Sequence, residues 1–169
     1  MNDLPERLAA FKLADPLPQE FVCVLSGTDL KISSGIESVR LGYKKTAGLY
    51  LWLMRYRGSA YKIYVGSTNC LSTRLHNYIS DFQPHSPNDY KLRVFLAFIL
   101  EQMPGATLDL YFSKRSCKGL KATEARAVAT YRPLLNDLPK ASQSTKQDFT
   151  KAFELYYRRA FTGKLRDDT

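Results

Sequence analysis

Residues 47–67 read AGLYLWLMRYRGSAYKIYVGS, and this stretch decides the fold. Its two halves are rich in Leu, Tyr, Trp, Ile and Val, and the segment Arg57-Gly58-Ser59 separates them. Aromatic and β-branched residues favour strands, and a glycine favours a tight turn. The pattern therefore predicts a β-hairpin with strands at 47–56 and 60–65.

The pairing register of this hairpin decides where Tyr50 and Tyr64 lie. Side chains alternate between the two faces of a strand, so pairs whose residue numbers have an even sum place both tyrosines on one face. Residue 52 opposite residue 64 is such a register, and it would leave the tyrosines as diagonal neighbours about 7–8 Å apart. An odd sum would place them on opposite faces. Taken alone, two tyrosines in a hairpin are also compatible with ordinary packing roles.

The rest of the chain alternates between helical and strand patterns. Residues 67–69 (STN) offer N-cap side chains for a helix that follows the hairpin and runs to about Ser80. The other expected elements are a short helix at 5–13, a strand at 21–25, a helix from Ser34, helices at 89–102, 120–131 and 146–161, and a strand at 107–112.

These elements predict a small mixed α/β (α+β) domain with a three-stranded antiparallel sheet flanked by helices. We expect its core at 46–137, with residues 1–45 as an N-terminal extension packed on the core and 138–169 as a C-terminal helical extension. The chain has 169 residues, enough to bury such a core.

The composition is that of an ordinary globular domain, with 44% hydrophobic and 24% charged residues. No apolar run approaches the length of a membrane span, and the N-terminus lacks a basic region followed by an apolar one, so we expect a cytoplasmic location. The three cysteines Cys23, Cys70 and Cys117 form no CxxC pair. Their odd number and wide spacing disfavour zinc ligation and a disulfide framework.

The net charge of +9 indicates an anionic partner. Its distribution is uneven: residues 1–30 are mainly acidic, whereas the two stretches 43–62 and 114–132 are strongly basic, with Glu124 as the single acid among them. Positive charge concentrated in this way is expected where phosphates are bound, so we favour nucleic acid over a merely solvated basic face.

Five short motifs follow one another in a fixed order. They are GLY at 48–50, YVGS at 64–67, RLHNY at 74–78, Glu124 within the helix at 120–131, and YRPLLN at 131–136. Each is weak evidence alone. Together they resemble the GIY-YIG endonuclease family over about residues 47–136, which implies a GIY-YIG-like domain and hydrolysis of phosphodiester bonds.

The resemblance implies a role for each motif residue. Tyr50 would be the general base or would position the attacking water, and Tyr64 would orient the same network. Arg74 would hold the scissile phosphate, because its planar guanidinium matches phosphate oxygens. Glu124 would coordinate one divalent ion, Mg²⁺ or Mn²⁺, which assists the leaving group. Asn136 would support the site.

Some positions depart from the family pattern or leave alternatives. Where some members have a histidine one turn after the arginine, this chain has Tyr78, which we prefer over His76 as a site residue. Another branch has lysine after the second glycine, where this chain has Ser67. We expect the residues that contact nucleic acid outside the catalytic set to include Lys62, His76, Lys118 and Lys121, and we leave a role for His85 open.

The leading hypothesis is a metal-dependent DNA endonuclease of the restriction type or from a phage or mobile element. A restriction-type enzyme would act as a homodimer, because each domain would hold one metal site and two strands must be cut. The alternatives are a structure-specific repair or recombination nuclease and a catalytically silent nucleic-acid-binding module. The recognition sequence cannot be read from the chain.

Overall fold

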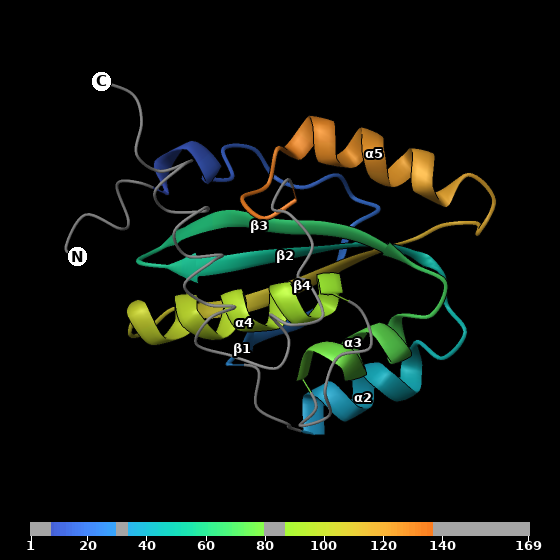
Figure 1. The fold of residues 1–169 in the computed structure, drawn as a ribbon, viewed down its shortest axis with the longest axis horizontal. Helices are drawn as coiled ribbons and strands as arrows, with labels where there is room; N and C mark the ends of the chain where they lie inside the picture. The colour runs from blue at the N-terminus through green and yellow to red at the C-terminus, as the bar shows by residue number, and fades with distance from the viewer. Residues whose placement is uncertain (1–7, 30–33, 80–86, 137–169) are drawn as a thin grey trace.

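A computed structural model describes residues 8–29, 34–79 and 87–136 of the chain. They form a mixed α/β fold in which one four-stranded antiparallel sheet, in the order β1-β4-β2-β3, lies between helices (Figure 1). The elements are η1 (Ala9–Phe11), β1 (Val22–Thr28), α2 (Ser34–Gly42), β2 (Gly48–Tyr56), β3 (Ser59–Thr68), α3 (Leu71–Ile79), α4 (Pro87–Gln102), β4 (Thr107–Lys114) and α5 (Leu120–Tyr131).

The expected three-stranded sheet is wrong by one strand. The apolar run after Phe21 was placed in the N-terminal extension, but it forms β1 and pairs with β4, with Val22 opposite Phe112. Its register shifts twice, at Cys23/Leu25 and at Leu25/Thr28. Without β1, the outer edge of β4 would present unpaired backbone groups. The extension therefore completes the sheet.

The hairpin of β2 and β3 contains a bulge that sets the register of the tyrosines. Arg57 and Gly58 form the two-residue turn with φ of 46° and 76°, values typical of a type I′ turn. Next to the turn, residue 56 pairs with residue 59, so the two residue numbers add up to an odd number. The register then shifts between Trp52 and Leu53. Beyond the shift Trp52 pairs with Tyr64, an even sum. The extra residue of this β-bulge, Ile63, restores Tyr64 to the face of Tyr50.

Each face of the sheet has its own apolar cluster. The first face carries Tyr50, Trp52 and Tyr64, and α2, α3 and α4 cover it (Figure 1). The second face carries Leu51 and Val65 and is covered by α5, which lies on the opposite side of the sheet. Because successive residues of a strand point to opposite faces, β2 and β3 contribute to both clusters.

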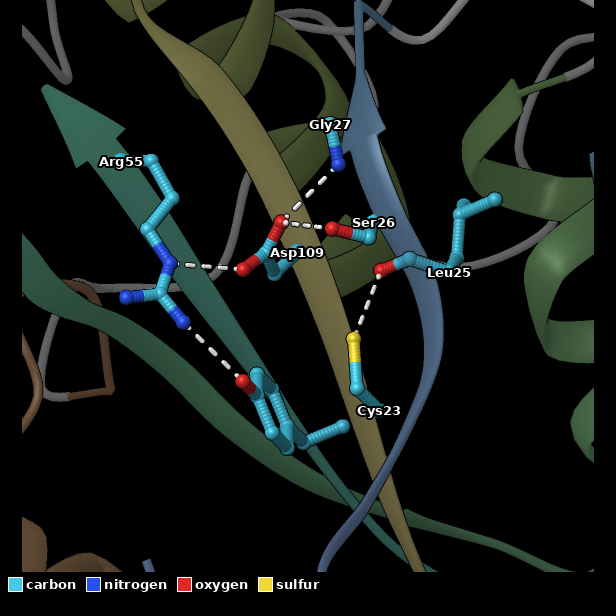
Figure 2. Close-up of polar contacts among 7 residues, drawn as sticks. Cys23, Leu25, Ser26, Gly27, Arg55 and Asp109 are labelled. Atoms are coloured by element: carbon cyan, nitrogen blue, oxygen red, sulfur yellow. Dashed lines mark hydrogen bonds and ion pairs between the residues drawn. The ribbon is translucent and has the colours of Figure 1, made fainter. Parts of the chain in front are cut away.

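A buried carboxylate ties three strands together away from the candidate site. Asp109 of β4 is only 3% exposed. It accepts hydrogen bonds from Gly27 N (2.9 Å) and Ser26 Oγ (3.2 Å) of β1 and from Arg55 Nε (2.7 Å) of β2. Figure 2 shows Asp109 between these groups. Arg55, which lies in the basic stretch 43–62, is thus a structural brace, and its hydrogen bond to Asp109 raises its pKa.

The outer edge of β3 is covered by segments from both ends of the domain. Leu8 is fully buried in the first cluster, and Leu13 N donates to Ala60 O at 2.8 Å. From the other side, Leu134 N donates to Lys62 O at 3.1 Å. The described part of the N-terminal extension therefore packs on the core. The predicted C-terminal extension at 138–169 lies outside the described residues.

No helix among the described residues is long and apolar enough to cross a membrane.

Candidate active site

Tyr50 and Tyr64 form a buried pair on the first face of the sheet. Their ring centroids are 6.1 Å apart with an interplanar angle of 36°, and the two residues are 2% and 6% exposed. Gly66 pairs with Tyr50 across the hairpin. A Cβ at position 66 would lie 2.4 Å from the Tyr50 hydroxyl and 2.9 Å from Tyr64 Cε1. Only glycine at this position leaves room for the phenol against the backbone of β3.

Arg74 reaches the site from the first turn of α3. The turn before this helix is fixed by Thr68, whose Oγ1 accepts from Cys70 N at 3.1 Å. Of the three residues expected to cap the helix, Thr68 thus makes the backbone contact, and the helix begins at Leu71. Leu71 and Leu75 are buried in the first cluster and anchor α3. Arg74, between them, lines a pocket at the end of β3.

Glu124 approaches the same end of β3 from the second face. Its Oε2 accepts a short hydrogen bond from Ser67 Oγ and another from Lys121 Nζ at 2.9 Å. The Glu124 side chain is 20% exposed and Ser67 is 7% exposed, whereas the Lys121 side chain is 85% exposed. Ser67 holds the carboxylate because it follows Gly66 in β3 and so faces the side opposite to the tyrosines.

The pocket between β3, α3 and α5 has a volume of about 350 Å³. The amino end of α5 forms one wall, where the N-cap residue Gly119 provides no side-chain cap and the first turn holds no acid. Backbone amides at such an end attract anions. The lining residues are Ser67, Thr68, Asn69, Arg74, Cys117, Gly119, Leu120 and Lys121.

The pocket therefore brings together one part of the predicted set. Arg74 and Lys121 line it, and Glu124 is joined to it through Ser67. Among the described residues, neither Tyr50 nor Tyr64 lines it. The tyrosines lie behind it on the first face, next to Gly66.

Asn136 closes the edge of β3 behind the pocket. Its Nδ2 donates to Val65 O at 2.7 Å, and Val65 N donates to its Oδ1 at 2.9 Å. The side-chain amide thus imitates a neighbouring strand. It fixes the residue between Tyr64 and Gly66, which is a supporting role.

The other predicted residues are placed less centrally. Lys62 pairs with Leu53, whose side chain belongs to the second cluster, so Lys62 lies on the face away from the tyrosines. Lys118 is exposed in the loop before α5, and His76 is half-buried in α3. Tyr78 belongs to α3, but its side chain lies outside the described residues, as does all of His85.

Ser67 is the contact that sequence analysis missed. It was noted there as a departure from the family pattern, whereas in the structure it binds Glu124. The available signal was a polar residue directly after Gly66, on the strand face that α5 covers. The contact needs the packing of α5 on β3, which local patterns do not reveal.

The donors fit a hard divalent ion held by few protein ligands. A carboxylate from Glu124 and a hydroxyl from Ser67 are oxygen donors of the kind that Mg²⁺ binds together with several waters. Within 8–29, 34–79 and 87–136 no group of three or more His, Cys, Asp or Glu residues could form a metal cage.

A scan against protein-family models, a search of curated proteins and a search of solved structures found no match to this chain.

Proposed function

We propose that the protein is a divalent-metal-dependent DNA endonuclease with a GIY-YIG-like site. The observation that carries the proposal is the gathering of Arg74 from α3, Lys121 from α5 and the Ser67–Glu124 pair, which joins β3 to α5, around one pocket. Two cations and a helix amino end would attract a phosphate, and the carboxylate would bind the metal ion. A phosphodiester is one of the few ligands that would use both the cationic groups and a metal-binding carboxylate.

In this proposal Arg74 binds and orients the scissile phosphate. Its side chain can donate two parallel hydrogen bonds to phosphate oxygens, which fixes the direction of attack. The amino end of α5 and Lys121 add positive charge where the negative charge of the pentavalent intermediate develops.

The tyrosine pair would handle the proton of the attacking water. Tyr50 would accept that proton as a tyrosinate and so become the neutral phenol, or as a phenol would position the water, and Tyr64, whose ring centroid lies 6.1 Å away, would hold Tyr50 in place. The tyrosines are buried, so water would have to reach them through an opening beside Gly66, the residue adjacent to Ser67. Glu124 and Ser67 would hold Mg²⁺ or Mn²⁺. When bound, the metal would neutralise charge on the phosphate and the leaving oxygen.

The burial of the tyrosines favours a second candidate, a nucleic-acid-binding module without catalysis. Tyr50 is 2% exposed and Tyr64 is 6% exposed, so in this structure their hydroxyls do not line the pocket. Cleavage would need a small opening near Gly66, whereas binding would not.

A cleavage assay separates the two candidates. The protein is incubated with supercoiled plasmid and with branched DNA, in Mg²⁺ and in EDTA, beside Arg74→Ala and Glu124→Gln. We expect wild-type cleavage only with Mg²⁺, at least 100-fold loss in both variants, and retained DNA binding in Glu124→Gln.

The matched controls are Arg40→Ala and Glu37→Gln, an ion pair on α2 that does not line the pocket. Both should cleave like wild type. Unchanged cleavage by Glu124→Gln would overturn the metal assignment. Tight binding with no cleavage of any substrate by the wild type would leave only the binding module. Preference for branched DNA would indicate a repair or recombination enzyme.

A further inference from the structure

Three loops lie side by side at the end of the sheet that carries the pocket. Gly48, the first residue of β2, pairs with Thr68 at the end of β3 and with Lys114 at the end of β4. Backbone hydrogen bonds join the loops that follow: Leu71 N donates to Thr46 O at 3.1 Å, and Arg115 N donates to Ala47 O at 3.0 Å. The loop before β2 is therefore next to both segments that line the pocket.

These loops carry exposed lysines, and among the described residues no carboxylate pairs with them. Lys44 and Lys45 precede β2, Lys114 ends β4, and Lys118 precedes α5, and all four are exposed. In the described part of the chain, none of the four contacts a carboxylate. Arg115 differs, because its guanidinium pairs with Glu20 at 2.9 Å. We call the four lysines the basic rim.

Part of the rim is held in place by the core. Lys114 Nζ lies 5.7 Å from the centroid of the Tyr43 ring, a cation–π contact. That ring in turn packs edge-on against Phe112, with centroids 5.4 Å apart. Lys45 has a φ of 54°, a conformation that non-glycine residues adopt at a cost. The Lys114 side chain is thus held against the core.

We propose that the basic rim binds the phosphates of a nucleic-acid strand on one side of the pocket, so that the strand runs from the pocket across the loop before β2. Contacts of this kind bind the backbone regardless of sequence and position it in the site. Cleavage of the strand at the pocket rests on the proposed function, whereas binding of the strand by the basic rim does not.

The opposite end of the sheet supplies a matched control. Arg57 is exposed at the hairpin turn, has a φ of 46°, and lies 5.0 Å over the Tyr56 ring, much as Lys114 lies over Tyr43. Lys12 is exposed nearby, where it pairs with residue 61. β2 has nine residues, so the two ends are about 27 Å apart.

The test is DNA binding in EDTA, where cleavage plays no part. Fluorescence anisotropy with a labelled 25-base-pair duplex is measured between 50 and 200 mM NaCl for three proteins. They are the wild type, the rim variant Lys44→Ala/Lys45→Ala and the control Lys12→Ala/Arg57→Ala, which loses the same charge. We expect the rim variant to bind about tenfold more weakly, with a salt slope smaller by about 1.8. The control should change less than twofold.

Equal loss in the rim and control variants would overturn the proposal, because it would show an effect of net charge alone. Tighter binding of the wild type to phosphatidylserine vesicles than to DNA would also overturn it. Cleavage in Mg²⁺ at saturating DNA separates this proposal from the proposed function. If the wild type never cleaves while the rim variant binds weakly, the nuclease fails and the rim stands. If the wild type cleaves and the rim variant binds normally, the rim alone fails.

Discussion

Replacing Gly66 with alanine tests the link between the tyrosine pair and the site most directly. The added methyl group would lie 2.4 Å from both Cζ and the hydroxyl oxygen of Tyr50 and 2.9 Å from Tyr64 Cε1. Contacts between carbon atoms need about 3.5–4.0 Å, so the Tyr50 ring must move by about 1 Å and the Tyr64 ring by about 0.6 Å. Both rings are buried, and Tyr50 is only 2% exposed, so neither can swing into solvent.

The expected cost has two parts. Forcing a methylene-sized group into a packed core destabilises a protein by about 1–3 kcal/mol. Displacement of the Tyr50 hydroxyl by about 1 Å would lower the cleavage rate about 100-fold if Tyr50 handles the proton. The loss of activity would thus exceed what the loss of folded protein explains.

The assay pairs urea unfolding with single-turnover cleavage at saturating DNA. Gly42→Ala is the control, because a Cβ at position 42 meets no atom within 4 Å and should leave both quantities unchanged. If Gly66→Ala unfolds at lower urea but cleaves at the wild-type rate, Tyr50 has no part in the chemistry. If it loses neither stability nor activity, the packing of Tyr50 against β3 is itself wrong.

Four further predictions follow from single contacts. Asn136→Ala removes two hydrogen bonds to the edge of β3 and should cost about 2 kcal/mol of unfolding free energy in urea. Asp109→Asn weakens the brace of β1 and should cost about 2 kcal/mol in the same assay, since its arginine partner is half-exposed. Lys121→Met frees Glu124 of a competing cation and should strengthen Mn²⁺ binding, measured by calorimetry, about two- to fivefold. Burial raises the pKa of Tyr111, so its contribution to stability is complete below about pH 10 and is lost as the pH rises through the folded-state pKa; Tyr111→Phe should make the melting temperature less sensitive to pH above 10.

Among the described residues, local patterns predicted most elements but not every partner. Of the helix expected at 5–13, the described residues form only the 3₁₀ helix η1 (Ala9–Phe11), and the helix expected at 146–161 lies outside the described residues. The bounds of α5 agree with the expected helix at 120–131, and the helix expected from Ser34 begins there. The place of β1 could not be predicted in this way. Its pairing with β4 joins residues such as Val22 and Phe112, far apart in the sequence, and two register shifts obscure its alternation.

The register of the hairpin shows what a local argument leaves open. The turn at Arg57-Gly58 alone implies an odd sum, which would have separated Tyr50 from Tyr64. The bulge at Ile63 changes the sum to even, and no residue type in the strand marks it. The even register places Tyr50 and Tyr64 on one face, as the candidate site requires. It depends on the bulge at Ile63, which packing of the first face selects.

Candidate residues could be named from the sequence, but their geometry could not be predicted from it. The sequence order brings no information on which face of the sheet each group occupies. In the structure the tyrosines lie on the first face, and Glu124 reaches β3 from the second. The charge pattern also does not reveal the partner of Arg55, because Asp109 lies more than 50 positions away.

The end of β3 connects the tyrosine pair on the first face of the sheet with Glu124 on the second face. Gly66 and Ser67 are consecutive, so one faces the tyrosines and the other faces Glu124. A movement of this dipeptide would shift the phenols and the carboxylate together. The hydrogen bonds of Asn136 to Val65, the preceding residue, restrain such movement. Asn136→Ala should therefore lower cleavage and weaken Mn²⁺ binding in the same variant. A loss of stability with both functions intact would show that the tyrosine pair and Glu124 act separately.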